Sequence, residues 1–156
     1  MNNLNCLTDN CINCPHDKSI APYELEAFCN FMKQFEINRI VESGTYKGVT
    51  AKRLSLIYPN YKIYSFEIRN KRYSAIPKKN YAENIRFKLG NLKLKYLTLN
   101  TAVIIDGPKR LEAIKLAKKC RKIVPFVAIH DMHEYRDVLK TTFKKVEFCG
   151  VLAICV

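Results

Sequence analysis

The stretch from Arg39 to Gly48, RIVESGTYKG, decides the fold. Its first half is a short apolar run with β-branched residues, which predicts a buried strand over residues 39–44. Gly44 then allows a tight turn, and a helix is expected over residues 47–58, where Pro59 ends it. A buried strand that turns directly into a helix is the first unit of an α/β sheet, and such turns are where these sheets bind ligands.

The same alternation continues on both sides of this unit. Further strands are expected at residues 62–68, 85–89, 101–106 and 126–130, with a closing antiparallel pair at 144–148 and 151–156. Further helices are expected at residues 22–35, 70–79, 108–122 and 134–140. The sequence therefore predicts a Rossmann-like α/β domain. Its sheet would be seven-stranded and mostly parallel, with a C-terminal antiparallel hairpin and helices on both faces.

The length of the chain, 156 residues, suits one domain with a single core. We expect residues 22–156 to form that domain and residues 1–21 to be a cysteine-bearing N-terminal extension. The opening residues, MNNLNCLTDN, lack the basic and apolar segments of a signal peptide, and no apolar run reaches the roughly 20 residues of a membrane span. The expected compartment is the cytoplasm, where cysteines remain thiols or bind metals rather than form disulfides.

The positive charge is unevenly distributed along the chain. Residues 39–100 carry fourteen lysines and arginines against three acids, which is +11 of the net +13. Such an excess attracts polyanions, so nucleic acid is one expected partner. The alternative is a lysine-rich surface that only keeps the helices solvated. The sequence contains no KH loop or RNP motif that would identify an RNA-binding module.

The turn after the first expected strand holds the first candidate binding residues. They are Glu42, Ser43, Gly44, Thr45 and Gly48. Gly44 lets the backbone approach a ligand without an intervening Cβ, and the helix amides that follow Gly48 can face a carboxylate. A pyrophosphate needs the full Gly-x-Gly-x-x-Gly pattern, which this turn lacks, so a nicotinamide dinucleotide is disfavoured.

The next two expected strands also end in polar side chains, Glu67 and Asn91. An acid at the tip of the second strand accepts the hydroxyls of a bound ribose. With the first turn and the strand order, this arrangement resembles the class I S-adenosylmethionine-dependent methyltransferases over residues 38–156. The resemblance implies S-adenosylmethionine as the cofactor, Glu67 at its ribose, and Asn91 where the family has an aspartate near adenine. Tyr46 departs from the family pattern, because a glycine is usual there.

Candidate catalytic residues follow the fourth and fifth expected strands: Asp106, His130 and Asp131. The pair of aspartates is similar to that of the metal-dependent, catechol-type O-methyltransferases. That similarity implies that Asp106 and Asp131 hold a divalent ion such as Mg²⁺, which lowers the pKa of the acceptor hydroxyl. Met132 departs from it, since asparagine is usual there. His130 is the alternative, as a general base whose ordinary pKa lies near the working pH. A helix cap and turn without catalysis is the third interpretation.

A second candidate metal site lies near the N-terminus. Its ligands would be Cys6, Cys11, Cys14 and His16. Three thiolates and one imidazole suit tetrahedral zinc, although cysteines without a ligand role are an equal alternative. Three other cysteines, Cys120, Cys149 and Cys155, lie in apolar patterns and are expected as small core residues.

The sequence thus predicts an S-adenosylmethionine-dependent methyltransferase. The chain lacks both the Asp/Asn-Pro-Pro-aromatic motif of enzymes that methylate amino groups of nucleic acids and a Pro-Cys nucleophile after the fourth strand. These absences favour an oxygen acceptor, so O-methylation of a small molecule or sugar is the first hypothesis. A basic RNA-binding or RNA-modifying protein of the same fold is the second. A domain that binds the cofactor without catalysis is the third.

Overall fold

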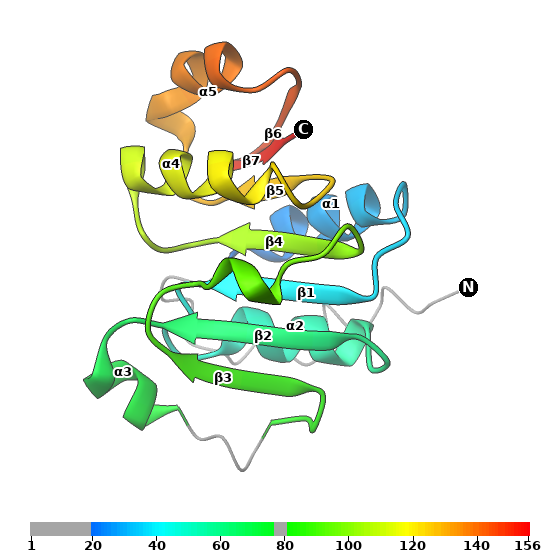
Figure 1. The fold of residues 1–156 in the computed structure, drawn as a ribbon, viewed down its shortest axis with the longest axis vertical. Helices are drawn as coiled ribbons and strands as arrows, with labels where there is room; N and C mark the ends of the chain where they lie inside the picture. Colours follow the sequence, from blue (N-terminus) through cyan, green and yellow to red (C-terminus); the bar gives the residue numbers. More distant parts are fainter. Residues whose placement is uncertain (1–19, 77–80) are drawn as a thin grey trace.

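The computed structural model describes residues 20–76 and 81–156, and it contains one seven-stranded sheet (Figure 1). The strands are β1 Arg39–Ser43, β2 Lys62–Glu67, β3 Ile85–Leu89, β4 Thr101–Ile105, β5 Val127–Ile129, β6 Val146–Cys149 and β7 Leu152–Cys155. Their order is β3-β2-β1-β4-β5-β7-β6. Strands β1 to β5 run parallel, whereas β7 is antiparallel to both β5 and β6. The predicted parallel sheet with a closing hairpin is confirmed.

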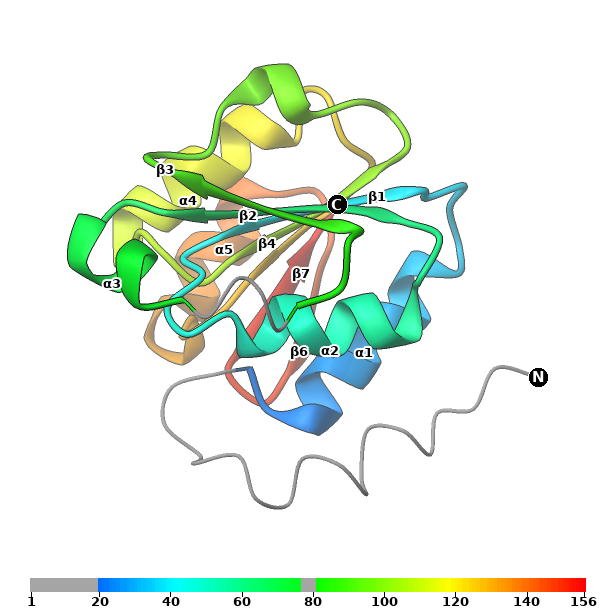
Figure 2. The ribbon, with the colours of Figure 1, turned by 90° about the horizontal axis from the view of Figure 1, so that it is seen from below.

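The helices lie on both faces of this sheet, as predicted. They are α1 Pro22–Met32, α2 Val49–Ile57, α3 Asn70–Ala75, α4 Arg110–Cys120 and α5 Arg136–Thr142. Figure 2 shows α1 and α2 covering one face, with α4 and α5 on the other. Two short 3₁₀ turns, Leu94–Tyr96 and His133–Tyr135, were not expected from the sequence.

Several elements differ from their expected bounds by two or three residues. The first helix ends at Met32 instead of residue 35, because Gln34 and Phe35 continue as hydrogen-bonded turns. The helix expected from residue 108 begins at Arg110 and the one expected from 134 begins at Arg136. Pro108 and Lys109 belong to the loop after β4, whereas Glu134 and Tyr135 belong to the 3₁₀ turn that precedes α5. Of the helix expected at 70–79, the structure describes the part up to Ala75.

The sheet is buried on both faces, which explains why its strands are continuously apolar. Neighbouring residues such as Ile40 and Val41 are both fully buried but belong to different core clusters, one under α1 and α2 and the other under α4 and α5. In the first cluster Phe126 packs against Phe28 and Phe31 of α1 and against Phe35, which follows α1. The ring centroids are 5.0–5.7 Å apart. Burying one large apolar side chain of this kind contributes roughly 1.5–3 kcal/mol.

Two expectations about smaller features need correction. Cys120 and Cys155 are fully buried core residues, but Cys149 is only half-buried, because it lies on the edge strand β6. Ile20, expected in the N-terminal extension, is 1% exposed and packs in the core, and the Arg53 guanidinium donates to its carbonyl at 2.9 Å. In the described part of the chain, no helix has both the length and the apolar character needed to cross a membrane.

Candidate functional site

The turn after β1 is held against the loop after β4. The amides of Gly44 and Thr45 both donate to the Phe66 carbonyl, at 2.8 and 3.0 Å, and the Gly107 amide donates to the Ser43 carbonyl at 2.9 Å. Gly44 has φ +97°, and a Cβ built on it would lie 2.5 Å from the Gly107 nitrogen. Only glycine fits this position, so the first turn and the β4 loop come into backbone contact because residue 44 has no side chain.

Glu42 and its neighbours lie beneath this turn and support it. Glu42 is 1% exposed, and the Ser65 hydroxyl donates to its carboxyl group. Burial raises the pKa of Glu42 to about 8, and the nearby charges of Asp106 and Glu67 also raise it, while the Ser65 hydrogen bond opposes the shift. The hydroxyls of Ser43 and Thr45 are engaged with the Gly107 carbonyl and Ser65. The predicted roles of these three side chains in direct cofactor contact therefore have no geometric support.

A pocket of about 550 Å³ opens above the turn at the carboxyl edge of the sheet. It is lined by the first turn, the end of β2 and the loops after β4 and β5: Gly44, Tyr46, Glu67, Ile68, Arg69, Arg72, Asp106, Gly107, Pro108, Lys109, His130 and Asp131. Its volume suits a small organic ligand, for which pockets of roughly 300–1,000 Å³ are usual. Two candidate cofactor residues, Gly44 and Glu67, thus share one cavity with the three candidate catalytic residues.

Glu67 presents a fixed carboxylate to this pocket. One carboxylate oxygen accepts from the Tyr46 amide at 3.0 Å and the other from the Arg69 amide at 2.9 Å. The side chain is 3% exposed, whereas its neighbour Ile68 is 55% exposed and lines the same pocket. A carboxylate beside an exposed apolar surface suits the polar sugar and the flat base of a nucleoside.

Asn91 and Gly48 lie outside the residues that line this pocket. Gly48, with φ +78°, caps the N-terminus of α2 behind the turn. Asn91 is exposed and lines a second hollow of about 640 Å³ beside the first one, where the loop after β3 faces α4. Ser43 and Pro108 also line this hollow, which places it directly beyond the β4 loop. A contact between Asn91 and an adenine in the first pocket is therefore not supported.

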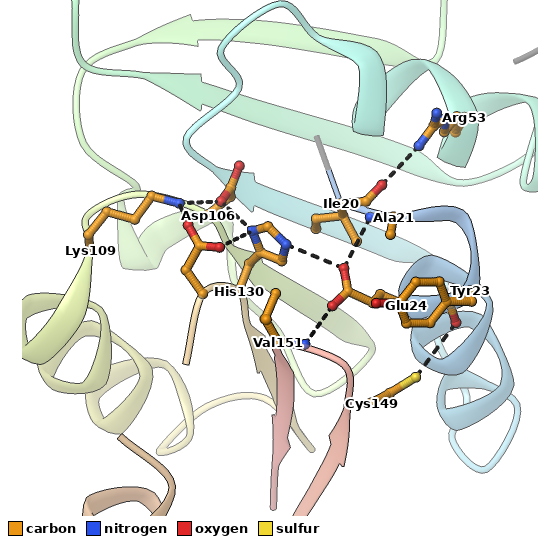
Figure 3. A network of polar contacts seen from close by, with 11 residues as sticks. Ile20, Ala21, Tyr23, Glu24, Arg53, Asp106, Lys109, His130, Cys149 and Val151 are labelled. Atoms are coloured by element: carbon orange, nitrogen blue, oxygen red, sulfur yellow. Dashed lines mark hydrogen bonds and ion pairs between the residues drawn. The ribbon is translucent and has the colours of Figure 1, made fainter. Parts of the chain in front are cut away.

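Lys109 is the residue that connects the two candidate aspartates, and the sequence patterns did not single it out. Its ammonium nitrogen lies 2.6 Å from Asp106 Oδ1 (Figure 3). The same nitrogen lies 2.6 Å from Asp131 Oδ2. Burial lowers the pKa of Lys109, but the two carboxylates raise it by more than burial lowers it. The net pKa is therefore raised, and the amine is held in its charged form. Burial raises the pKa of Asp131, but the Lys109 hydrogen bond and the charge of His130 outweigh burial. The pKa of Asp131 is therefore lowered.

His130 lies behind this pair, with both ring nitrogens facing carboxylates. Nδ1 is 2.9 Å from Asp106 Oδ1, and Nε2 is 3.3 Å from Glu24 Oε2 (Figure 3). Nδ1 is also 3.4 Å from Asp131 Oδ1. Burial lowers the pKa of His130, but the Asp106 hydrogen bond and the charges of the three carboxylates outweigh burial and raise it above 6.5. A base that worked alone would need a ring nitrogen free of other partners, and these contacts engage both.

Glu24 is the second site residue that sequence analysis missed. It lies on α1 and is 1% exposed, and its carboxylate accepts from the Ala21 amide at 3.1 Å and from the Val151 amide at 2.8 Å. It therefore joins the start of α1, the turn between β6 and β7, and His130 (Figure 3). An acid in the first turn of a helix suggests a capping role in sequence, so nothing in the local pattern pointed to the distant His130.

Asp106, His130 and Asp131 form, within the described residues, the group whose ligand atoms could surround a metal ion; these atoms lie within 4.8 Å of one another. The ammonium of Lys109, however, contacts both carboxylates. A divalent ion would have to displace a cation that already balances part of their charge. The predicted Mg²⁺ site therefore does not fit this arrangement while Lys109 remains in place. The other predicted site, Cys6, Cys11, Cys14 and His16, lies outside the described residues.

The second hollow is lined largely by one basic helix face. Four lysines of α4 and the residues just after it border the hollow: Lys115, Lys118, Lys119 and Lys122. Glu112 is the acid among its lining residues, and it pairs with Lys115 at 2.7 Å. The remaining lysines leave the hollow positively charged, directly beside the pocket of Glu67 and Asp106.

Comparisons with solved structures place the fold. Precorrin-6y C5,15-methyltransferase from Geobacter metallireducens superposes with a TM-score of 0.69 at 11% identity, covering 94% of this chain and 92% of that one. The O-methyltransferase TomG from Streptomyces achromogenes, solved in complex with S-adenosylmethionine, gives 0.58 at 14%, covering 88% and 68%.

A third similar structure is the tRNA (m1A58) methyltransferase TrmI from Aquifex aeolicus, with a TM-score of 0.64 at 16% identity, covering 85% of this chain and 56% of that one. No protein-family model matches the sequence, and no curated protein matches it in sequence either. The architecture is thus the Rossmann-like fold of the class I methyltransferases, as predicted from the sequence.

Proposed function

We propose that this protein, which has the fold of the class I methyltransferases, transfers the methyl group of S-adenosylmethionine to an oxygen atom of a small molecule or sugar. One observation carries the proposal: the Gly44 turn and Glu67 share a pocket with Asp106, His130 and Asp131. A cofactor held by the first group would therefore lie next to the second. The similar structures support the reaction class, since they carry out methyl transfer to small molecules and to RNA.

The cofactor would be held mainly by Glu67. Two backbone amides already orient its carboxylate, so little side-chain freedom is lost when the ribose hydroxyls donate to its remaining lone pairs. The exposed side chain of Ile68 offers an apolar surface to the base, and Gly44 allows the cofactor to approach the backbone. When bound, S-adenosylmethionine supplies an electrophilic methyl group on a positively charged sulfur.

The acceptor would enter on the side of the aspartates. Methyl transfer needs an in-line approach, so the protein contributes mainly by positioning the acceptor oxygen and removing its proton. Both aspartates contact Lys109 and His130, but the side chain of Asp131 is 47% exposed whereas that of Asp106 is 11% exposed. Asp131 is therefore the group that reaches the acceptor proton, and Asp106 and His130 position it and stabilise its surroundings.

Cofactor binding to Glu67 variants tests the proposal. We expect calorimetry to show S-adenosylmethionine binding by the wild type, and Glu67→Ala to weaken it by on the order of 1–3 kcal/mol, because the ribose hydroxyls lose a charged acceptor. Glu67→Gln keeps one acceptor oxygen and should lose less. Glu83→Ala removes an exposed carboxylate outside the pocket and serves as the matched control. A folded Glu67→Ala protein with unchanged affinity would remove the ribose role.

A second candidate acceptor is RNA, and the lysine-lined hollow favours it. Lys118 and Lys119 of α4, with Lys122 just after it, lie beside the proposed reaction site and could hold the phosphates of a polynucleotide. If RNA is the acceptor, its affinity should fall steeply as salt rises from about 50 to 200 mM, because bound phosphates release counterions. A flat salt response would assign these lysines to a solvated surface.

A further inference from the structure

The loop after β4 places the lysine Lys109 between the two aspartates of the pocket. Lys109 is three residues beyond Asp106, in the loop whose backbone contacts Gly44, and its ammonium lies 2.6 Å from an oxygen of each aspartate. An ammonium group has three donor hydrogens, and these contacts use two. No contact to a further partner is found for Lys109 in residues 20–76 and 81–156, which leaves the third donor for a ligand in the pocket that Lys109 lines.

The two aspartates are placed to hold this cation firmly. His130 contacts Asp106 from behind, so Asp106 keeps its orientation while it accepts from Lys109. Asp131 adopts φ +60°, a left-handed conformation that is uncommon for residues other than glycine. Its carboxylate reaches from the loop after β5 to Lys109 in the loop after β4. The loops after β4 and β5 thus each place one carboxylate on the same ammonium group.

We infer that Lys109 is the resident cation of the acceptor site, where its ammonium binds the acceptor oxygen and makes a divalent metal unnecessary. The inference rests on the proposed function and concerns the same pocket. A fixed positive charge beside the acceptor hydroxyl favours its deprotonation, as a bound metal ion does. The short contacts to both aspartates exclude a second cation from the same oxygens unless Lys109 moves away.

The transfer step moves one proton and one methyl group. The acceptor O–H bond breaks and its proton passes to the Asp131 carboxylate, while the oxygen forms a bond to the methyl carbon. The bond between that carbon and sulfur breaks, and its electron pair remains on sulfur, which becomes a neutral thioether. Lys109 keeps all its protons throughout and donates a hydrogen bond to the acceptor oxygen as negative charge develops on it.

Manganese binding tests the inference without knowledge of the acceptor. Lys109→Met removes the ammonium and leaves the two aspartates and His130 as an available donor set, so we expect Mn²⁺, followed by electron paramagnetic resonance, to bind at least about tenfold more tightly than to the wild type. Lys109→Gln is measured in parallel as a polar variant of similar length. Lys145→Met is the matched control, because it removes the same charge from a lysine that pairs with Glu147 at 2.7 Å and lines neither the pocket nor the hollow.

The outcome separates this inference from the proposed function. If the wild type and the folded Lys109 variants bind Mn²⁺ with equal affinity, whether tight or weak, Lys109 is not the resident cation and the inference is overturned. Calorimetry with S-adenosylmethionine on the same samples tests the function itself. A wild type that binds no S-adenosylmethionine overturns the proposed function, while the manganese comparison still decides what occupies the cation position.

Discussion

Glu42→Gln should stabilise the protein at neutral and higher pH. The pKa of Glu42 rises from an ordinary value of 4.5 to about 8, chiefly because of its burial. A group whose pKa is raised in the folded state makes its full contribution to the free energy of unfolding at pH values below its unfolded-state pKa. That contribution is lost as the pH rises through the folded-state pKa. Between these limits the folded chain must hold a proton that the unfolded chain has released.

The size of this effect follows from the gap between the working pH and the ordinary pKa. At pH 7 that gap is about 2.5 units, and one unit corresponds to about 1.4 kcal/mol, so the penalty on the wild type is about 3 kcal/mol. Glutamine carries no proton to lose and keeps an oxygen that can accept from the Ser65 hydroxyl. We therefore expect a gain in unfolding free energy that grows from near zero at about pH 4.5 towards this value at pH 7.

Urea unfolding of the wild type and Glu42→Gln across this pH range measures the effect. Glu26→Gln, an identical change on the exposed surface of α1, is the control and should change the unfolding free energy little at any pH. S-adenosylmethionine affinity should survive Glu42→Gln, since Glu42 does not line the pocket. A difference between the two proteins that stays constant with pH would show that Glu42 is ionised in the folded state, and would refute the argument.

Three further predictions follow from the site. Gly44→Ala should lower the unfolding free energy by at least about 2 kcal/mol, because its Cβ would lie 2.5 Å from the Gly107 nitrogen; an unchanged urea midpoint would contradict this. His130→Gln should lower the free energy of unfolding most below pH 6.5, because protonated His130 faces the carboxylates of Asp106, Asp131 and Glu24. The loss should shrink as the pH rises through the raised pKa of His130. Urea unfolding at about pH 6 and 9 measures this trend, and the opposite trend would count against a protonated His130. If RNA binds, replacing Lys118 and Lys119 by alanine should weaken RNA binding and flatten its salt dependence. Replacing Lys140 and Lys144, which lie outside the hollow, should have neither effect. Equal losses of affinity in filter binding would show that RNA is attracted to the whole basic surface and not to the hollow.

The mostly parallel sheet with its closing hairpin could be predicted because few topologies satisfy the pattern. Buried apolar runs alternate with helical segments, and right-handed crossovers then restrict how a parallel sheet can be wound. The convergence of Asp106 with His130 and Asp131 follows from the same rule, since β4 and β5 are neighbours and their carboxyl ends meet at one edge. Glu67 is placed at the pocket for the same reason, through β2 and β1.

Loop positions could not be predicted in this way. Asn91 follows β3 as expected, but its loop turns towards α4, so its side chain lines the lysine-rich hollow instead of the pocket of Glu67. Lys109 is one of 27 lysines and arginines in the chain, and nothing in its local sequence distinguishes it. Its contact with both aspartates depends on the path of the β4 loop, which is set by the backbone packing of Gly44 on Gly107.

The sequence by itself determined the α/β architecture, the edge of the sheet that carries the site, and the acids at its strand tips, because periodicity and strand ends are local properties. Only the tertiary structure decided which of these acids face a ligand and what charge they carry. The pKa of Glu42 is raised because the fold buries it, and His130 is held between carboxylates because α1 brings Glu24 beside β5. Protonation depends on desolvation and on neighbouring charges, and both arise only when distant segments pack together.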